Sequence, residues 1–111
     1  MRGIRSLLLT FFVVFLLCDT ASAHRVNLFA YVEGGKVYTE SYFSDGKPVK
    51  GGKVTVYDSQ KRLLKEGLTD QEGLFHFDIP KVDDLTIVIN ASMGHRKSFT
   101  LKKSEVEEGK R

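Results

Sequence analysis

The chain has 111 residues, of which 17 are Lys or Arg and 14 are Asp or Glu, so that its formal net charge is +3. This length accommodates one small domain at most, and so weak a positive charge does not indicate a nucleic-acid partner. A single cysteine, Cys18, excludes a disulfide scaffold within the chain.

The first 23 residues have the pattern of a secretory signal peptide. A short basic start precedes the apolar run LLLTFFVVFLLC (7–18), and an A-x-A cleavage pattern ends at Ala23. The apolar run is shorter than the ~20 residues that a spanning helix needs. We therefore expect cleavage after Ala23 and a periplasmic or other extracytoplasmic mature chain (24–111) with 15 basic residues, 13 acidic residues and no cysteine. An uncleaved membrane anchor and a lipoprotein attached through Cys18 remain as alternatives.

The mature chain alternates strand-like runs with turn residues. Strands are expected at 25–33, 36–43, 53–58, 62–69, 74–79, 85–91 and 96–101. Both faces of the first run are apolar, with Phe29 and Tyr31 turned away from its other apolar side chains, so we expect this strand to be central in its sheet. The pattern predicts an all-β fold, an antiparallel β-sandwich of about seven strands at 24–102. A charged, flexible tail is expected to follow at 103–111.

Two motifs in the middle of the chain resemble a known fold. DGKPVKGGKVTVYD (45–58), followed by LTDQEGLFHFDIP (68–80), is similar to the carboxypeptidase-regulatory, or prealbumin-like, sandwich. In that pattern a D-G-x-P-V loop leads into a V-x-V strand, and T-D-x-x-G-x-F-x-F follows. The resemblance implies the fold and little about function, because such modules are widely reused.

A second resemblance covers almost the whole mature chain. It is carried by the histidine that follows the signal peptide, by YTESYFSDG (38–46) and by MGHR (93–96). These features are similar to small extracytoplasmic auxiliary components of ECF-type (energy-coupling factor) nickel and cobalt transporters. The resemblance implies a metal-related role outside the membrane, with a nickel or cobalt ion bound and the membrane components of the transporter as partners. It does not supply a coordination sphere.

The histidines offer a metal site of their own. After cleavage, His24 would be N-terminal and would present its free amine and its imidazole to one ion. If every short turn reverses the chain, His95 lies at the same end of the sandwich as His24, together with the Asp45 loop and the 70–72 turn. Three nitrogens suit Ni(II) or Cu(II). We therefore predict metal ligation by His24 and His95, with Glu40 as a candidate third ligand.

The remaining signals are structural or negative. His76 is expected on an outer strand face and Met93 in loop packing. The chain has no H-E-x-x-H, G-x-S-x-G or Walker pattern, so we do not expect an enzyme. Two alternatives to a role in nickel or cobalt uptake stay open, a β-sandwich interaction module of the cell envelope that binds no metal and a periplasmic copper-binding protein.

Overall fold

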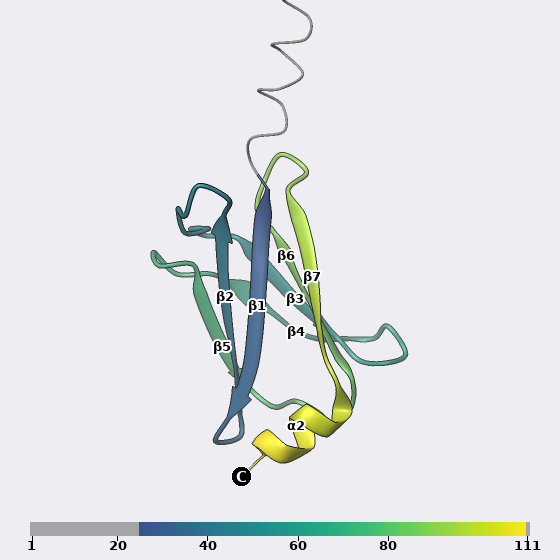
Figure 1. Cartoon of the computed structure of the whole chain (residues 1–111). Coiled ribbons are helices and arrows are strands. Elements are labelled where there is room, and N and C mark those ends of the chain that lie inside the picture. The colour runs from purple at the N-terminus through teal and green to yellow at the C-terminus, as the bar shows by residue number, and fades with distance from the viewer. Residues whose placement is uncertain (1–24, 111) are drawn as a thin grey trace, which may run out of the picture.

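The computed structural model describes residues 25–110, which form two antiparallel sheets packed face to face and one short helix (Figure 1). The expected all-β sandwich is thereby confirmed. Within residues 25–110, no helix is long and apolar enough to cross a membrane. The predicted signal peptide and its cleavage site lie outside the described residues.

All seven expected strands are present in the described part of the chain. They are β1 (Val26–Glu33), β2 (Lys36–Phe43), β3 (Lys53–Tyr57), β4 (Leu63–Leu68), β5 (Leu74–Asp78), β6 (Leu85–Asn90) and β7 (Arg96–Leu101), and the helix is α2 (Lys103–Gly109). The strand ends differ from the sequence prediction by one residue at most. One sheet has the order β1-β2-β5 and the other the order β4-β3-β6-β7.

The core lies between the two sheets and follows from the two-residue period of the strands. Every second side chain of a strand points inward, and in this chain most of those are Val, Ile or Leu. The fully buried aliphatic strand residues are Val37, Val54, Val56, Leu85, Ile87, Ile89 and Leu101. Burial of each such side chain is worth about 1.5–3 kcal/mol relative to exposure, so this layer holds the two sheets together.

Strand β1 is an edge strand, which corrects the expectation that it would be central. Within residues 25–110 it pairs with β2 alone, at one margin of the three-stranded sheet. Phe29 and Tyr31 remain 48% and 37% exposed, and the Phe29 ring meets the edge of the Phe99 ring of β7 at a centroid distance of 5.7 Å. The second apolar face of this strand is therefore an aromatic surface and does not reflect burial in a sheet.

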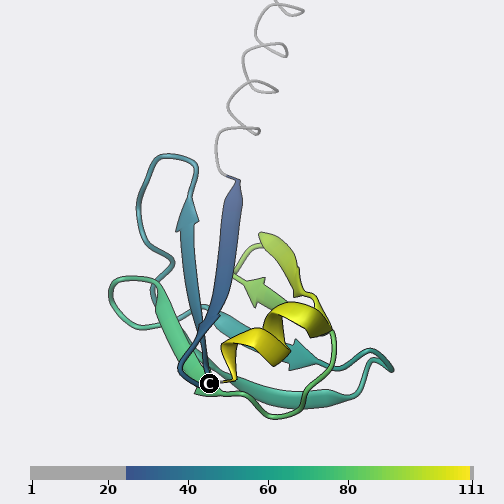
Figure 2. The same cartoon turned by 60° about the horizontal axis from the view of Figure 1, so that its bottom comes forward.

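The expected flexible tail is also wrong, because residues 103–109 form helix α2 (Figure 2). Val106 of this helix is fully buried. The N–H of Gly35 donates a hydrogen bond of 2.8 Å to the carbonyl of Gly109. A Cβ at Gly109 would lie 2.3 Å from Cγ1 of Val32, so the helix approaches β1 closely. One apolar residue in a charged run is enough to anchor the segment.

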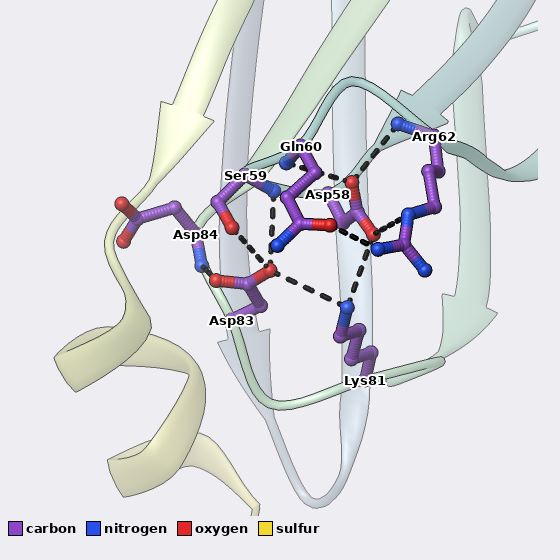
Figure 3. A network of polar contacts seen from close by, with 7 residues as sticks. All are labelled: Asp58, Ser59, Gln60, Arg62, Lys81, Asp83 and Asp84. Atoms are coloured by element: carbon purple, nitrogen blue, oxygen red, sulfur yellow. Dashed lines mark hydrogen bonds and ion pairs between the residues drawn. The ribbon is translucent and has the colours of Figure 1, made fainter.

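A polar network around Asp58 ties together the end of the sandwich beside α2, which we call the helix end (Figure 3). Asp58 follows β3, and its side chain is 1% exposed. Its carboxylate accepts hydrogen bonds from the backbone N–H groups of Gln60 and Arg62, at 2.9 Å each, and from Nζ of Lys81 at 3.0 Å. The Arg62 N–H, with smaller contributions from Lys81 and Gln60, holds the pKa of Asp58 below its usual value, although burial acts in the opposite direction.

Two further aspartates extend this network toward α2. Asp83 accepts hydrogen bonds from the hydroxyl and the N–H of Ser59, at 2.8 and 3.1 Å, and these bonds hold the pKa of Asp83 below its usual value. Its carboxylate also lies 3.7 Å from Nζ of Lys81. Asp84 accepts a bond of 2.7 Å from the N–H of Lys103, the first residue of α2. The β3–β4 turn, the β5–β6 connection and the helix are thus joined.

Candidate functional site at the loop end

The opposite end of the sandwich, the loop end, gathers the start of β1, the 44–52 loop, the 70–73 turn and the 92–95 turn (Figure 1). The N–H of Ser44 donates to the carbonyl of Arg25 at 2.9 Å, and the N–H of Ser41 donates to the carbonyl of Gly73 at 2.9 Å. The expectation from strand directions, that these turns and the first strand residues share one end, is confirmed.

His95 closes the tight turn between β6 and β7. Its N–H donates to the carbonyl of Ser92 at 3.1 Å, and its own carbonyl accepts from the N–H of Ala91 at 2.8 Å. Ser92, Met93 and Gly94 have φ values of 56°, 54° and 79°, which is the left-handed region. Non-glycine residues occupy that region at a cost of about 1–2 kcal/mol each. The bonded turn holds the backbone of His95 in place, and its side chain is half-buried.

Phe43 stands between the start of β1 and His95. It is the register partner of Val26 in the β1–β2 pair. Its ring meets the His95 imidazole edge-on, at a centroid distance of 6.1 Å and an interplanar angle of 80°. The neighbouring Arg25 donates its backbone N–H to Oγ of Ser44 at 3.3 Å. Predicted ligand His24 lies outside the described residues, but the residue that follows it shares this end with His95.

Glu40 lies on a different surface of the molecule. In the β-sheet register it sits between Phe29 of β1 and Leu74 of β5, and its side chain is exposed on the outer face of the three-stranded sheet. Phe43, three residues later, belongs to the inward set of β2. The structure therefore does not bring Glu40 to His95. Among residues 25–110 no group of three or more His, Cys, Asp or Glu side chains could hold a metal ion.

The other two residues considered from the sequence lie on the surface. His76 is exposed on β5, as predicted, and its ring centroid lies 5.9 Å from that of Tyr38. Met93 is 93% exposed at the tip of the β6–β7 turn, so the expected loop packing of this residue is wrong. The three left-handed residues of the turn hold the Met93 side chain out in solvent.

An open cavity of about 580 Å³ adjoins Phe43 at the loop end. Pro48 and Val49 contribute apolar wall, and Lys47 and Lys50 lie at its margin. Neither lysine forms an ion pair with another residue of the 25–110 region. Sequence reasoning missed this cavity, and the available signal was the apolar Pro-Val pair set between two lysines inside a turn-rich loop.

The geometry defines a small β-sandwich domain, and comparisons with known proteins add one relative. No family model matches the chain, and no solved structure matches it. The chain is 30% identical over 90 residues to a Haemophilus influenzae protein described as "Uncharacterized protein", an alignment that covers 78% of this chain and 56% of that protein. The chain thus spans about half the length of this relative, and the likeness carries no functional information.

Proposed function

We propose that the chain is an extracytoplasmic accessory protein of nickel or cobalt uptake. It would bind the ion at its mature N-terminus and pass it to the membrane components of an ECF-type transporter. The resemblance of the motifs around Glu40 and His95 to such components supports the proposal. The structural observation that supports it is that Arg25, the residue after the predicted ligand His24, lies at the same end of the sandwich as His95.

In the proposed site, His24 contributes its amine nitrogen and ring Nδ1, and His95 contributes one imidazole nitrogen. The ordinary pKa of an α-amino group is about 7.7–8.0, so a divalent ion displaces its proton readily near neutral pH. Glu40, expected as a third protein ligand, faces the other side of the sheet, and the proposal therefore rests on the two histidines. The remaining positions are open to water or to a transporter ligand, which suits a protein that hands its ion on.

The test is calorimetric titration of Ni(II) and Co(II) into the mature chain that begins at His24. His95→Ala should weaken binding about tenfold or more, which corresponds to ~1.4 kcal/mol. His76→Ala is the matched control, because that exposed imidazole lies on the outer sheet face, and it should leave the affinity unchanged. Equal losses for the two variants would show nonspecific imidazole binding and refute the site.

A second variant tests the terminal amine. One additional Met before His24 should remove most of the affinity, because the amine then no longer belongs to the histidine that carries the chelating ring. Equal affinity of the extended and the processed chain would show that the amine is not a ligand. Any such nitrogen site binds Cu(II) more tightly than Ni(II) or Co(II), so relative affinity does not distinguish a copper-binding protein from a nickel or cobalt uptake protein. Transport of each ion in cells that lack the protein distinguishes them.

An interaction module is the second candidate function, and a specific surface favours it. The outer face of the three-stranded sheet carries an exposed row of aromatic rings. This function does not require a metal ion and is compatible with the first one.

A further inference from the structure

The outer face of the β1-β2-β5 sheet is unusually apolar for a solvated surface. Of the seven large hydrophobic residues that are exposed in the described chain, four lie on this face, namely Phe29, Tyr31, Tyr42 and Leu74, with 37–48% of each exposed. We call the surface formed by these four residues together with Tyr38 the aromatic face. Exposed apolar side chains gathered on one face mark interaction sites in soluble proteins.

Cross-strand register arranges the aromatic face in rows. Tyr31, Tyr38 and His76 are direct partners across β1, β2 and β5. The Tyr31 and Tyr38 rings are stacked, with centroids 5.2 Å apart and an interplanar angle of 17°, and the Phe29 ring lies 6.0 Å from that of Tyr31. Because these rings already hold one another in place, they lose little side-chain entropy when a partner packs on them. Because the two tyrosine rings face each other, a partner meets their edges. A sugar would instead need an open ring face to stack on, so a sugar ligand is disfavoured.

The outer face of the other sheet shows that the fold does not need this aromatic surface. There the outward positions of β6 and β7 are mostly polar, and Thr86 lies 3.3 Å from Thr100 between the hydroxyl oxygens. These positions are Thr86, Val88, Asn90, Arg96, Ser98 and Thr100. A solvated face of an antiparallel sheet commonly has such polar residues. The contrast with the aromatic face is confined to β6 and β7, because Leu63 and Leu68 of β4 are 52% and 65% exposed.

Unpaired negative charge borders the aromatic face at its loop-end margin. A hollow of about 480 Å³ is lined by Tyr42 and Leu74 and by the acidic residues Glu40 and Glu72. Neither glutamate forms an ion pair with another described residue. Lys36, by contrast, which lies at the far margin of this face, is bound to Asp78 at 2.8 Å. The hollow thus combines apolar walls with two free carboxylates.

We propose that the aromatic face binds a protein segment in which apolar side chains flank a lysine or an arginine. The cation occupies the hollow between Glu40 and Glu72, and the apolar side chains pack over Phe29, Tyr31 and Leu74. Charge complementarity selects this occupant, because two unpaired carboxylates beside apolar walls attract a cationic side chain and repel an anionic lipid surface. The proposal is independent of the metal site, since no residue of the aromatic face belongs to the ligand set His24 and His95.

Selection from a library of random short peptides tests this proposal even though the partner protein is unidentified. The mature chain serves as bait, and the Leu74→Ser variant serves for counter-selection. We expect the enriched peptides to combine Lys or Arg with aromatic or aliphatic residues, and to lose about tenfold in affinity for the Leu74→Ser variant. Enrichment of acidic peptides, or no enrichment at all, would overturn the proposal.

Matched variants on the two sheets then locate the site. The double variant Glu40→Gln with Glu72→Gln should weaken the selected peptides by about tenfold, whereas Glu66→Gln on β4 should not. Leu68→Ser on β4, where the leucine is 65% exposed, is the control for Leu74→Ser. Equal losses of peptide affinity for Leu74→Ser and Leu68→Ser would show nonspecific adhesion and would overturn the proposal. Sedimentation that reveals a dimer which Leu74→Ser dissociates would assign the face to a second copy and overturn the proposal.

Discussion

The helix end and the loop end of the sandwich use their lysine side chains in different ways. At the helix end, Asp58 and Asp83 bind Lys81 and the N–H groups of the adjoining turn, so their charges are satisfied within the fold (Figure 3). At the loop end, Lys47 and Lys50 have no ion pair with another described residue.

Main-chain contacts hold the loop end, together with Asp45 and Asp70, whose carboxylates accept hydrogen bonds from N–H groups of their own turns. The buried hydroxyl of Thr69 donates to the carbonyl of Val49 and accepts from the N–H of Gly52 at 2.8 Å. The N–H of Gly51 donates to the carbonyl of Thr69 at 3.1 Å. Because these bonds fix the loops without the lysines, the side chains of Lys47 and Lys50 remain available to a ligand. Substitution of Lys81 should therefore affect folding, whereas substitution of Lys47 or Lys50 should affect binding.

The strongest destabilisation is expected from a steric clash in the backbone of the loop end. Gly73 has a φ of 77°, and a Cβ there would lie 2.3 Å from the carbonyl oxygen of Ser41. Gly73→Ala should therefore lower the free energy of unfolding by about 3 kcal/mol, as backbone strain and a steric clash add. Gly46→Ala is the control, because Gly46 has a φ of 89° and open space around it, and it should cost only about 1 kcal/mol. Urea unfolding measures both, and equal losses would mean that the loop end yields to the clash.

A smaller loss is expected from the anchor of α2 at the helix end. Val106→Ala removes buried methyl groups and should cost about 2 kcal/mol of unfolding free energy. Glu107→Ala in the same helix changes an exposed side chain and should cost less than about 0.5 kcal/mol. If Val106→Ala also stays near zero in urea unfolding, α2 is not part of the cooperative fold, and the helix end is held by the Asp58 network alone.

Local patterns in the sequence were sufficient to predict the strands. The two-residue period and the turn glycines, such as Gly34 and Gly35, are properties of a few neighbouring residues, and all seven strands were placed from them. The order of strands in a sheet depends on contacts between distant segments. The apolar outer face of β1 therefore led to a wrong position for that strand, and Val106 alone gave too weak a signal for α2.

The candidate site was predictable where it depended on chain direction alone. Alternating strands place Arg25 and His95 at one end, and the structure agrees. The prediction of Glu40 as a ligand was wrong, because strand alternation puts Glu40 and Phe43 on opposite faces of β2, and this parity is present in the sequence. The aromatic face could not be predicted, since the stacking of Tyr31 on Tyr38 requires the exact cross-strand register.

The weakest change in stability is expected when Asp58 at the helix end loses its charge. The pKa of Asp58 is lowered in the folded chain, first by the Arg62 N–H and then by Lys81 and Gln60. The stabilisation from this carboxylate is therefore complete above the ordinary aspartate pKa of about 3.9, and it is lost as the pH falls through the lower folded-state value. Asp58→Asn keeps a carbonyl oxygen for the turn N–H groups but places an NH2 donor where Lys81 now binds. Because the Lys81 side chain is 42% exposed and can turn to solvent, the melting temperature at neutral pH should fall less than for Val106→Ala.

The difference between Asp58→Asn and the unsubstituted chain should then shrink as the pH is lowered below about 4, since both side chains are neutral in strong acid. Lys81→Met separates the two causes, because it removes the ion pair of 3.0 Å and leaves the Arg62 and Gln60 N–H groups in place. Melting curves across this pH range should show that Lys81→Met removes only part of the acid dependence assigned to Asp58. If it removes all of it, the ion pair outweighs the backbone donors, and the helix end would be held by charge attraction between side chains.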